Sequence, residues 1–501
     1  MSSQPDKSFL GHPRGLATLF FTEMWERWSF YGMRSLLTPF LAAAVVEGGL
    51  GFGQDASPLY HIYLALIYLM SVPGGWLADR FLGQRRAVLW GGILIMCGHA
   101  VIAIHDTLAF FAGLMLVVLG TGLLKPNVSA VVGGLYSKTD ARRDAAFSLF
   151  YMGINLGSFL GQLVAPFLAQ HSSVRGFLEG LGIDPRYAWQ LGFGSAAVGM
   201  LSGIVQYVRG QKHLGAAGAA PSTPPSAADR RMLVGGSVLV AGVVLAVVFL
   251  TRAGKLSVER IDDSFGIFLT LLTVVVFAKI FAGSWTSAER RSLLAILVYF
   301  VASCLFWSAF EQAGSTLNLF AVEQTRPELF GVEFAPGWYQ NVNALGIIVL
   351  SPLFALLWLK LGPRDPSHPV KFALGLLFVG LGFLAMARGA AEVAAGGVGT
   401  RVSGMFLVVT YVFHSIGEVC LSPVGLSAMT RLAPGRVASL MMGVWFLSIS
   451  VGSYLGGRIA HAYSGLSQQS LFLTIAAVAI GGGVLMVLFV RPLKELSAPR
   501  E

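Results

Sequence analysis

Charged residues are scarce in this chain. Only 12% of its 501 residues are charged and 55% are hydrophobic, whereas soluble domains carry about 25% charged residues. Apolar runs long enough to cross a bilayer recur along the chain, including 87–104, 233–250 and 471–490. The two-residue alternation of membrane β-strands does not occur in these runs. We therefore expect an all-α integral membrane protein, because a helix satisfies its own backbone hydrogen bonds in lipid.

Cysteine and the short motifs of enzymes are also scarce. Cys97, Cys304 and Cys420 are the three cysteines, and they lie in apolar segments without the spacing of a metal site. The chain contains no HExxH, GxSxG or GxxxxGK motif. We therefore expect neither an enzyme nor a bound metal or organic cofactor. A channel or a membrane receptor is a further alternative, and the lack of a large soluble sensing domain argues against it.

The apolar runs predict fourteen membrane-spanning helices. A segment rich in Ala, Gly, Pro and Ser, residues 210–230, follows the sixth of them. The expected domains are a six-helix bundle over 1–208, a linker with two extra spans over 209–289, and a second six-helix bundle over 290–501. Two such bundles related by a pseudo-twofold axis form the major facilitator fold. The approximate limits of the spans are 15–45, 57–79, 85–105, 108–131, 143–170, 188–208, 231–251, 264–283, 290–321, 336–360, 369–388, 402–430, 435–462 and 468–491.

Basic residues outnumber acidic ones, and the formal net charge is +10. Such a charge often indicates nucleic-acid binding, but here most Lys and Arg residues lie in short loops between apolar runs. Counted from a cytoplasmic N-terminus, they concentrate on the cytoplasmic side, in agreement with the positive-inside rule. We expect both termini in the cytoplasm, a location in the bacterial inner membrane and no nucleic-acid partner. We expect no cleavable signal peptide, since the N-terminus is polar.

The loop after the second expected span has the pattern of a cytoplasmic gate. Residues 74–86 read GGWLADRFLGQRR and resemble the facilitator signature between the second and third helices. Paired glycines permit close helix approach, and Asp79 is placed to cap a neighbouring helix or to pair with an arginine. Arg80, Arg85 and Arg86 would face the cytoplasm. The alternative is an ordinary basic turn.

Ionisable residues inside the expected spans indicate a functional site, because such groups are costly in lipid and rare. The alternative is a set of buried ion pairs that only hold the helices together, but such pairs stabilise little after desolvation. The basic residues lie in the first half of the chain and two glutamates lie in the second half, so a zwitterion would fit between the halves. The set comprises Glu23, Glu26, Arg27, Arg34, His61, Lys125, Glu311 and Glu418.

Several motifs in order along the chain resemble those of the proton-dependent oligopeptide transporters, the peptide branch of the facilitator superfamily. The first span carries two glutamates, an arginine and an aromatic pair. Residues 147–159, 306–312 and 417–427 read FSLFYMGINLGSF, FWSAFEQ and GEVCLSPVGLS, which resemble later motifs of the family. Trp28 and Phe30 depart from the family, which commonly has Phe and Tyr there, so Phe30 removes one hydroxyl from the pocket.

This resemblance implies import of di- and tripeptides with protons by alternating access. Backbone and terminal groups shared by all dipeptides would be bound, so that one site accepts many side chains. For each aromatic residue near these charges, the alternative to a role in a substrate pocket is simple helix packing. The implied substrate-binding residues are Arg27, Arg34 and Lys125 for the carboxylate, Glu418 for the amino group, Asn155, Asn343 and Ser422 for the backbone, and Tyr31, Tyr68, Tyr151, Trp307 and Trp445 around side chains.

The resemblance also implies how protons would be coupled. A glutamate in a low-dielectric site can hold a proton near neutral pH, and its protonation would break an ion pair and free one bundle to move. His61 resembles a histidine found in animal members of the family and in only some bacterial ones. The implied proton-coupling residues are Glu23, Glu26, Arg27, Lys125, Glu311 and His61.

The runner-up is a facilitator-type transporter of another small solute, such as nitrate or an amino-acid conjugate. Glu418 argues against nitrate, because a carboxylate at the site would repel an anion. We expect the proton to be the coupling ion, the lipid bilayer to surround the protein, and the protein to be a monomer.

Overall fold

The computed structural model describes residues 8–137, 140, 142–255, 257–434, 438–462, 465 and 467–497. Before the linker come α1 (Arg14–Ala42), α2 (Ala56–Leu77), α3 (Gln84–Ile102), α4 (Thr107–Gly134), α5 (Arg143–Gln170), α6 (Ser172–Gly180) and α7 (Ala188–Gly210). Two helices follow it, α8 (Ala227–Arg252) and α9 (Val258–Phe281). The last group is α10 (Ser287–Phe310), α11 (Thr316–Glu323), α12 (Asn341–Leu361), α13 (His368–Gly396), α14 (Met405–Leu432), α15 (Ala438–Ala462), α16 (Gln468–Leu488) and α17 (Val490–Ser497).

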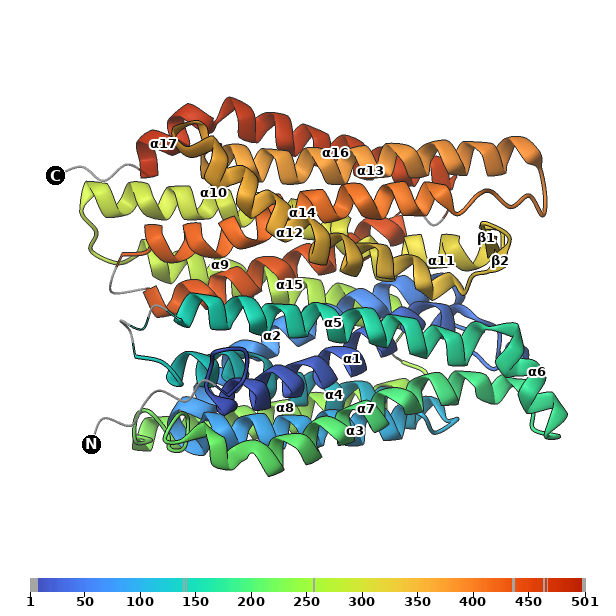
Figure 1. The fold of residues 1–501 in the computed structure, drawn as a ribbon, viewed down its shortest axis with the longest axis horizontal. Helices are drawn as coiled ribbons and strands as arrows, with labels where there is room; N and C mark the ends of the chain where they lie inside the picture. The colour runs from blue at the N-terminus through green and yellow to red at the C-terminus, as the bar shows by residue number, and fades with distance from the viewer. Residues whose placement is uncertain are drawn as a thin grey trace.

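Long helices run side by side along the whole molecule (Figure 1). Thirteen of the helical segments in the described residues are long and apolar enough to cross a membrane. Helix α1 has 29 residues but is not one of the thirteen, because its ionisable residues lower its hydropathy. With α1 added, the all-α membrane fold expected from the sequence is confirmed, although individual helix ends differ. The expected span 369–388, for example, continues to Gly396.

One expected span is wrong in kind, because 290–321 is not a continuous helix. Helix α10 ends at Phe310, a 3₁₀ turn η6 (Glu311–Gly314) follows, and α11 starts at Thr316. The Gln312 side chain holds the break, since its amide donates to the Ser308 and Gly456 carbonyls at 3.1 and 2.9 Å. The short antiparallel strands β1 (Glu328–Leu329) and β2 (Val332–Glu333) lie beyond α11.

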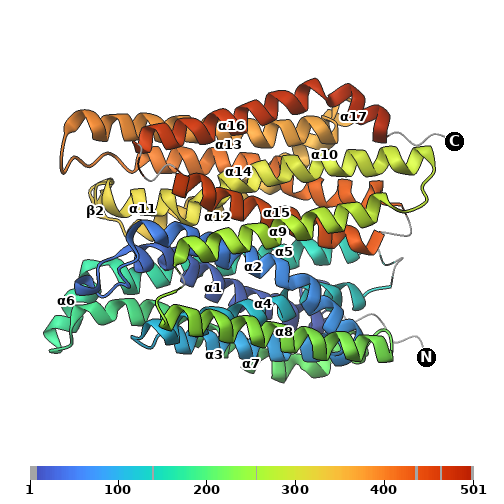
Figure 2. The ribbon, with the colours of Figure 1, turned by 180° about the vertical axis from the view of Figure 1, so that it is seen from behind.

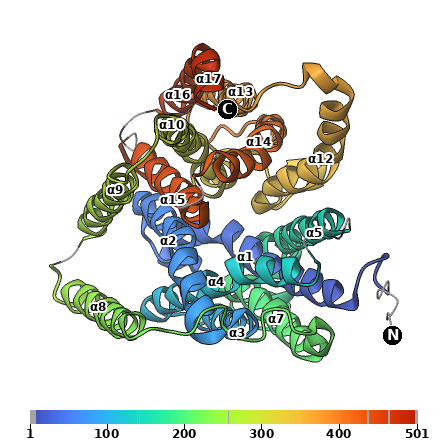
Figure 3. The same cartoon turned by 90° about the vertical axis from the view of Figure 1, so that its left-hand side faces the viewer.

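The helices form two groups that meet along α2 and α15 on one side and α5 and α12 on the other (Figure 3). Helices α1–α5 and α7 pack with one another, as do α10 and α12–α16. The described chain begins and ends at the same end of the bundles, and α6, α11 and the β-strands lie at the opposite end (Figure 1). The exact domain boundaries at 208 and 289 stay predictions.

The two extra helices lie outside both groups (Figures 2 and 3). In α8 none of the best apolar window is buried within the protein, so this helix faces lipid nearly all round. Helix α9 is held more firmly, because Arg458 on α15 pairs with the buried Asp262 at 2.6 Å. The Tyr454 hydroxyl also donates to the Asp262 carbonyl at 2.9 Å. Helix α9 is therefore fixed to the second bundle, and α8 is not.

Glycines permit a close contact between α1 and α5 in the first bundle. An added Cβ at Gly157 would lie 2.1 Å from the Met24 carbonyl oxygen, and one at Gly161 would lie 2.2 Å from that of Trp28. Because lipid is as apolar as the side chains, membrane helices associate through such close packing and through polar contacts. The α1–α5 contact therefore fixes the position of the charged face of α1.

We predict that Gly157→Ala destabilises the protein by about 3 kcal/mol or more, because its methyl group would overlap the backbone of α1. The matched control is Gly194→Ala on α7, where an added Cβ meets nothing within 4 Å. Gly194→Ala should keep or slightly raise the melting temperature, since alanine favours a helix by about 0.5–1 kcal/mol over glycine. Thermal unfolding in detergent measures both, and equal melting temperatures would contradict the prediction.

Candidate functional site

The first cluster of charges lies on one turn of α1. Arg27 Nε lies 3.1 Å from Glu23 Oε1 and also pairs with Glu26, and all three side chains are buried. Glu23 and Arg27 are four residues apart, so the helix places them on one face. Among the described residues, one oxygen of each glutamate and one nitrogen of Arg27 have no hydrogen-bond partner. The cluster is therefore buried, and its hydrogen bonds are only partly satisfied among the described residues.

A second ion pair joins the two bundles. Arg34 on α1 pairs with Glu311 in η6, and its Nε donates to the Tyr60 hydroxyl at 2.6 Å. The Thr38 hydroxyl donates to the Gly314 carbonyl at 2.6 Å. The break after α10 therefore places Glu311 where the arginine of the other bundle can reach it.

Lys125 and Glu418 remain without an ion pair within 4 Å among the described residues. Lys125 on α4 lies 4.2 Å from the centre of the Tyr68 ring, a cation–π contact. Glu418 on α14 accepts one hydrogen bond from the Asn343 amide at 3.1 Å. Both side chains are half-buried, one in each bundle. The site thus holds an unpaired positive and an unpaired negative charge on opposite sides.

A small cavity lies between the bundles beside the Arg34–Glu311 pair. Its volume of about 20 Å³ is enough for one water molecule. Gln162, Gln340, Tyr411 and His414 line it and were not predicted from the sequence. His414 and Gln162 are polar residues inside apolar runs. A search of the expected spans for all polar residues, and not only for charged ones, would have found both. The lining residues are Tyr31, Arg34, Gln162, Phe310, Ala313, Gln340, Asn343, Tyr411 and His414.

The predicted backbone-binding residues occupy different environments. Asn155 is buried, and its amide donates to the Tyr151 carbonyl of its own helix at 2.9 Å. The Tyr151 side chain is 44% exposed. Ser422 lies one helical turn after Glu418 and is half-buried, so these two share a face of α14.

Two predicted aromatic residues belong to helix packing. Trp307 is buried, and its Cβ lies 2.8 Å from where a Cβ on Gly452 would be. The ring of Trp445 covers Gly425 in the same way, at 2.2 Å. These tryptophans fill the space that glycine leaves between helices, and neither lines the described cavity.

His61 on α2 lies at the interface with the second bundle. It is buried, and its Nε2 lies 2.9 Å from the Ser315 hydroxyl. Gly456 and Gly457 on α15 leave room for His61. A Cβ at Gly456 would lie 3.0 Å from its ring, and a Cβ at Gly457 would lie 2.7 Å from its own Cβ. A substitution at His61 would therefore alter the packing of both bundles.

The predicted gate residues contact the linker. After α2 the chain forms a π-helical turn η3 (Ala78–Leu82), and Gly83 then adopts a φ of 76°. Arg85 Nε donates to the Ala217 carbonyl at 2.6 Å, and Asp79 accepts from the Ser222 hydroxyl at 3.2 Å. Asp79 was expected to cap a helix or pair with arginine, and the contact found with Ser222 differs from both.

The remaining gate residues are less firmly held. Arg80 lies 3.4 Å from Asp229 at the start of α8, and Arg86 is exposed. The signature loop is therefore fixed through the segment that leads from α7 to α8.

The end of the molecule opposite the termini is closed by contacts between the bundles. Gln170 accepts a hydrogen bond from the Gly337 backbone at 2.9 Å, and Trp338 Nε1 donates to the Leu163 carbonyl at 2.8 Å. Glu333 accepts from the Ser172 backbone at 2.8 Å. The hydrogen bonds from Ser172 hold the pKa of the Glu333 carboxyl below its usual range.

Two helical bundles with buried charges at their interface and one closed end define a membrane transporter of the major facilitator type. Comparison with known proteins narrows this class. A family model described as POT family matches residues 85–475, and the chain belongs to this family. The protein is therefore a multi-pass membrane transporter, and members of this family are not enzymes.

Similar proteins cover almost the full length. The "Di-/tripeptide transporter" of Lactococcus lactis subsp. cremoris is 36% identical over 99% of this chain and 98% of its own. The "Uncharacterized transporter YclF" of Bacillus subtilis (strain 168) is 40% identical over 97% and 96%. A crystal structure of the peptide transporter POT in complex with sulfate has a TM-score of 0.88, 40% identity and coverage of 99% and 98%. A POT family transporter in complex with 5-aminolevulinic acid has a TM-score of 0.88, 33% identity and 98% coverage of both chains.

We predict that Glu311→Gln lowers stability by about 3–5 kcal/mol, because it leaves Arg34 buried without a counter-charge. The double variant Arg34→Gln/Glu311→Gln should recover most of this loss. The control is Glu392→Gln, which removes the exposed partner of Arg388 and should change stability by less than about 1 kcal/mol. Thermal unfolding in detergent distinguishes these outcomes, and a double variant as unstable as the single one would contradict the prediction.

Proposed function

We propose that the protein imports di- and tripeptides together with protons by alternating access. The observation that carries the proposal is the unpaired Lys125 in one bundle and the unpaired Glu418 in the other. A peptide has a carboxylate and an ammonium group, so it can pair with both charges at once. Charge-assisted hydrogen bonds of this kind are about twice as strong as neutral ones. The related di-/tripeptide transporter of Lactococcus lactis supports the same substrate class.

In this proposal the peptide binds between the bundles with its carboxylate toward the cations of the first bundle. Arg27 and Arg34 already have carboxylate partners, so Lys125 is the cation most available to a ligand. Glu418 receives the ammonium group while Asn343 orients its carboxylate. Asn155 and Ser422 would bind the peptide backbone, and Tyr31, Tyr68 and Tyr151 would border the substrate side chains.

Proton coupling would act through the two ion-pair clusters. Protonation of Glu23 or Glu26 removes a negative charge from Arg27, which is then free to attract the peptide carboxylate. Protonation of Glu311 breaks the Arg34–Glu311 pair, which joins the bundles. A ligand or proton can shift the equilibrium between two states of the carrier only if it favours one of them. The Arg34–Glu311 pair exists only where the bundles touch. His61 would act through the same interface.

The membrane orientation is part of the proposal. We place both termini in the cytoplasm of a bacterial inner membrane, so that the closed end with Gln170, Glu333 and Trp338 faces outward. The structure would then be the state that releases substrate inward. We propose that the monomer is sufficient for transport, since both halves of the site come from one chain.

Uptake into proteoliposomes tests the function. The purified protein is reconstituted, a pH gradient is imposed, and labelled dipeptide, tripeptide, single amino acid, nitrate and 5-aminolevulinic acid are compared. We expect gradient-dependent accumulation of the peptides that a protonophore abolishes. Accumulation of peptide that persists with the protonophore would contradict proton coupling. Transport of nitrate or of 5-aminolevulinic acid without peptide would instead support another small solute as the substrate.

We predict that Glu418→Gln weakens the binding of ordinary dipeptides by about ten- to a hundredfold, because it removes a charge-assisted contact of about 1.5–3 kcal/mol. Peptides with a blocked amino terminus should lose much less, since they carry no ammonium group. Competition against a labelled dipeptide measures both. Equal losses for blocked and free peptides would show that Glu418 does not bind the amino group.

We predict that Glu26→Gln abolishes gradient-driven accumulation but preserves counterflow. Glutamine imitates the protonated glutamate, and Arg27 keeps Glu23 as a partner at 3.1 Å. Counterflow requires no net proton movement, because the carrier returns loaded. Both activities are measured on one preparation, with Glu392→Gln as the control. Accumulation near the unmodified level would place the proton site elsewhere, and loss of both activities in a folded protein would assign Glu26 to substrate or gating.

A further inference from the structure

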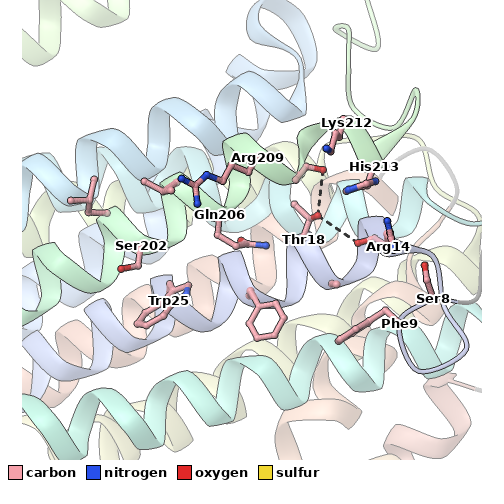
Figure 4. A pocket seen from close by; sticks show the side chains of 15 residues that line it. Ser8, Phe9, Arg14, Thr18, Trp25, Ser202, Gln206, Arg209, Lys212 and His213 are labelled. Carbon is pink, nitrogen blue, oxygen red and sulfur yellow. Dashed lines mark hydrogen bonds between the residues drawn. The ribbon is translucent and has the colours of Figure 1, made fainter.

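A groove of about 960 Å³ lies on the outer surface of the first bundle, between α1 and α7 (Figure 4). It lies at the end of the molecule that holds the termini, away from the cavity between the bundles. Its floor is closed where α7 meets α1, because a Cβ at Gly210 would lie 2.4 Å from the Thr18 hydroxyl oxygen. The groove is therefore a surface site that opens toward the lipid.

One part of the groove is strongly basic. Arg14, Arg209, Lys212 and His213 all line it, and Arg14, Lys212 and His213 gather at one end (Figure 4). None of the described residues that line it is acidic. Arg209 and Lys212 are exposed, and neither forms an ion pair with another described residue. The exposed cations Arg209 and Lys212, which have no ion pair among the described residues, favour an anionic ligand.

The other part of the groove is apolar. Phe21, Trp25, Leu201 and Val205 line it along the direction of the membrane helices. Phe21, Leu201 and Val205 are 38%, 48% and 40% exposed, so they offer their surface to a hydrocarbon chain. A ligand that matches the whole groove has an anionic head at the membrane surface and an apolar tail inside the membrane.

We propose that this groove binds an anionic phospholipid of the leaflet next to the termini. The phosphate would lie beside Lys212 and His213, with Arg209 farther along the groove, and an acyl chain would follow Leu201 and Val205. A membrane protein is surrounded by such molecules, and basic pockets between membrane helices on the cytoplasmic side recognise anionic headgroups. The proposal rests on the membrane orientation proposed above, with the termini in the cytoplasm, and does not depend on the transported substrate.

Native mass spectrometry of the purified protein in a nonionic detergent tests the headgroup. Phosphatidylglycerol and phosphatidylcholine with the same acyl chains are titrated in parallel. In a separate measurement, the melting temperature of the protein is determined with each lipid. We expect phosphatidylglycerol to bind more tightly and to raise the melting temperature more. Arg209→Gln/Lys212→Gln should weaken phosphatidylglycerol binding by about 10- to 30-fold and leave phosphatidylcholine unchanged. If the double variant does not fold, the exposed Lys212→Gln alone should weaken binding about fivefold.

The matched control removes two charges from the same end of the protein. Arg230 and Arg231 are exposed at the start of α8 and do not line the groove, so Arg230→Gln/Arg231→Gln should change binding less than about twofold. An equal loss in this control would show general surface attraction and overturn the site. Equal affinity for phosphatidylcholine, or an unchanged affinity in the Arg209 and Lys212 variants, would also overturn it.

A second arm tests the apolar part. Ser202 lines the groove, and its hydroxyl donates only to the Val198 carbonyl of its own helix at 3.0 Å. Ser202→Phe fills this part without a change in charge and should weaken phosphatidylglycerol binding. Glycerol phosphate, which has the headgroup chemistry without a tail, should not raise the melting temperature. Stabilisation by glycerol phosphate equal to that by the lipid would replace the proposal with a site for a soluble anion.

Discussion

The cost of placing charge in a membrane controls the structure around α1. This helix carries Glu23, Glu26, Arg27 and Arg34 through the bilayer, and each of these groups requires a partner because lipid offers none. Two partners come from the same turn of the helix, and a third, Glu311, comes from the other bundle. The helix that is least suited to lipid is thus the helix that lies between the bundles, where protein surrounds it.

In the proposed mechanism the Arg34–Glu311 pair contributes both to stability and to movement. A buried ion pair is strong only while both charges are present, because a single charge left behind is costly. Protonation of Glu311 or a competing carboxylate would change this balance. Glu311 is the first residue of η6, the 3₁₀ turn that interrupts the helix between α10 and α11. Loss of the pair would therefore act on a segment where the α-helix is already broken. This arrangement gives alternating access a defined point at which proton and peptide can act together.

Much of this fold follows from the sequence, because membrane helices are long apolar runs and intramembrane charges stand out within them. The eight ionisable residues were found in this way, and five of them form the two ion-pair clusters described above. The Arg34–Glu311 pair could not be predicted, since it depends on how the two bundles meet. The break at Glu311 could not be predicted either, since it depends on the contact of Gln312 with α15. Trp307 and Trp445 are large aromatic residues of the kind that often line a pocket. Their packing against glycines of neighbouring helices is visible only in the structure.

Lys125 and Glu418 give the strongest argument that the interface is built for a ligand. Each is half-buried and lacks an ion pair among the described residues, although Arg27 and Arg34 show that this chain readily supplies partners to buried charges. Local rules of stability are broken most often where function requires it. The two unpaired charges have opposite signs and belong to opposite bundles, so a zwitterion that bound both would bring the bundles together. Binding of such a substrate and closure of the carrier around it would then be one event.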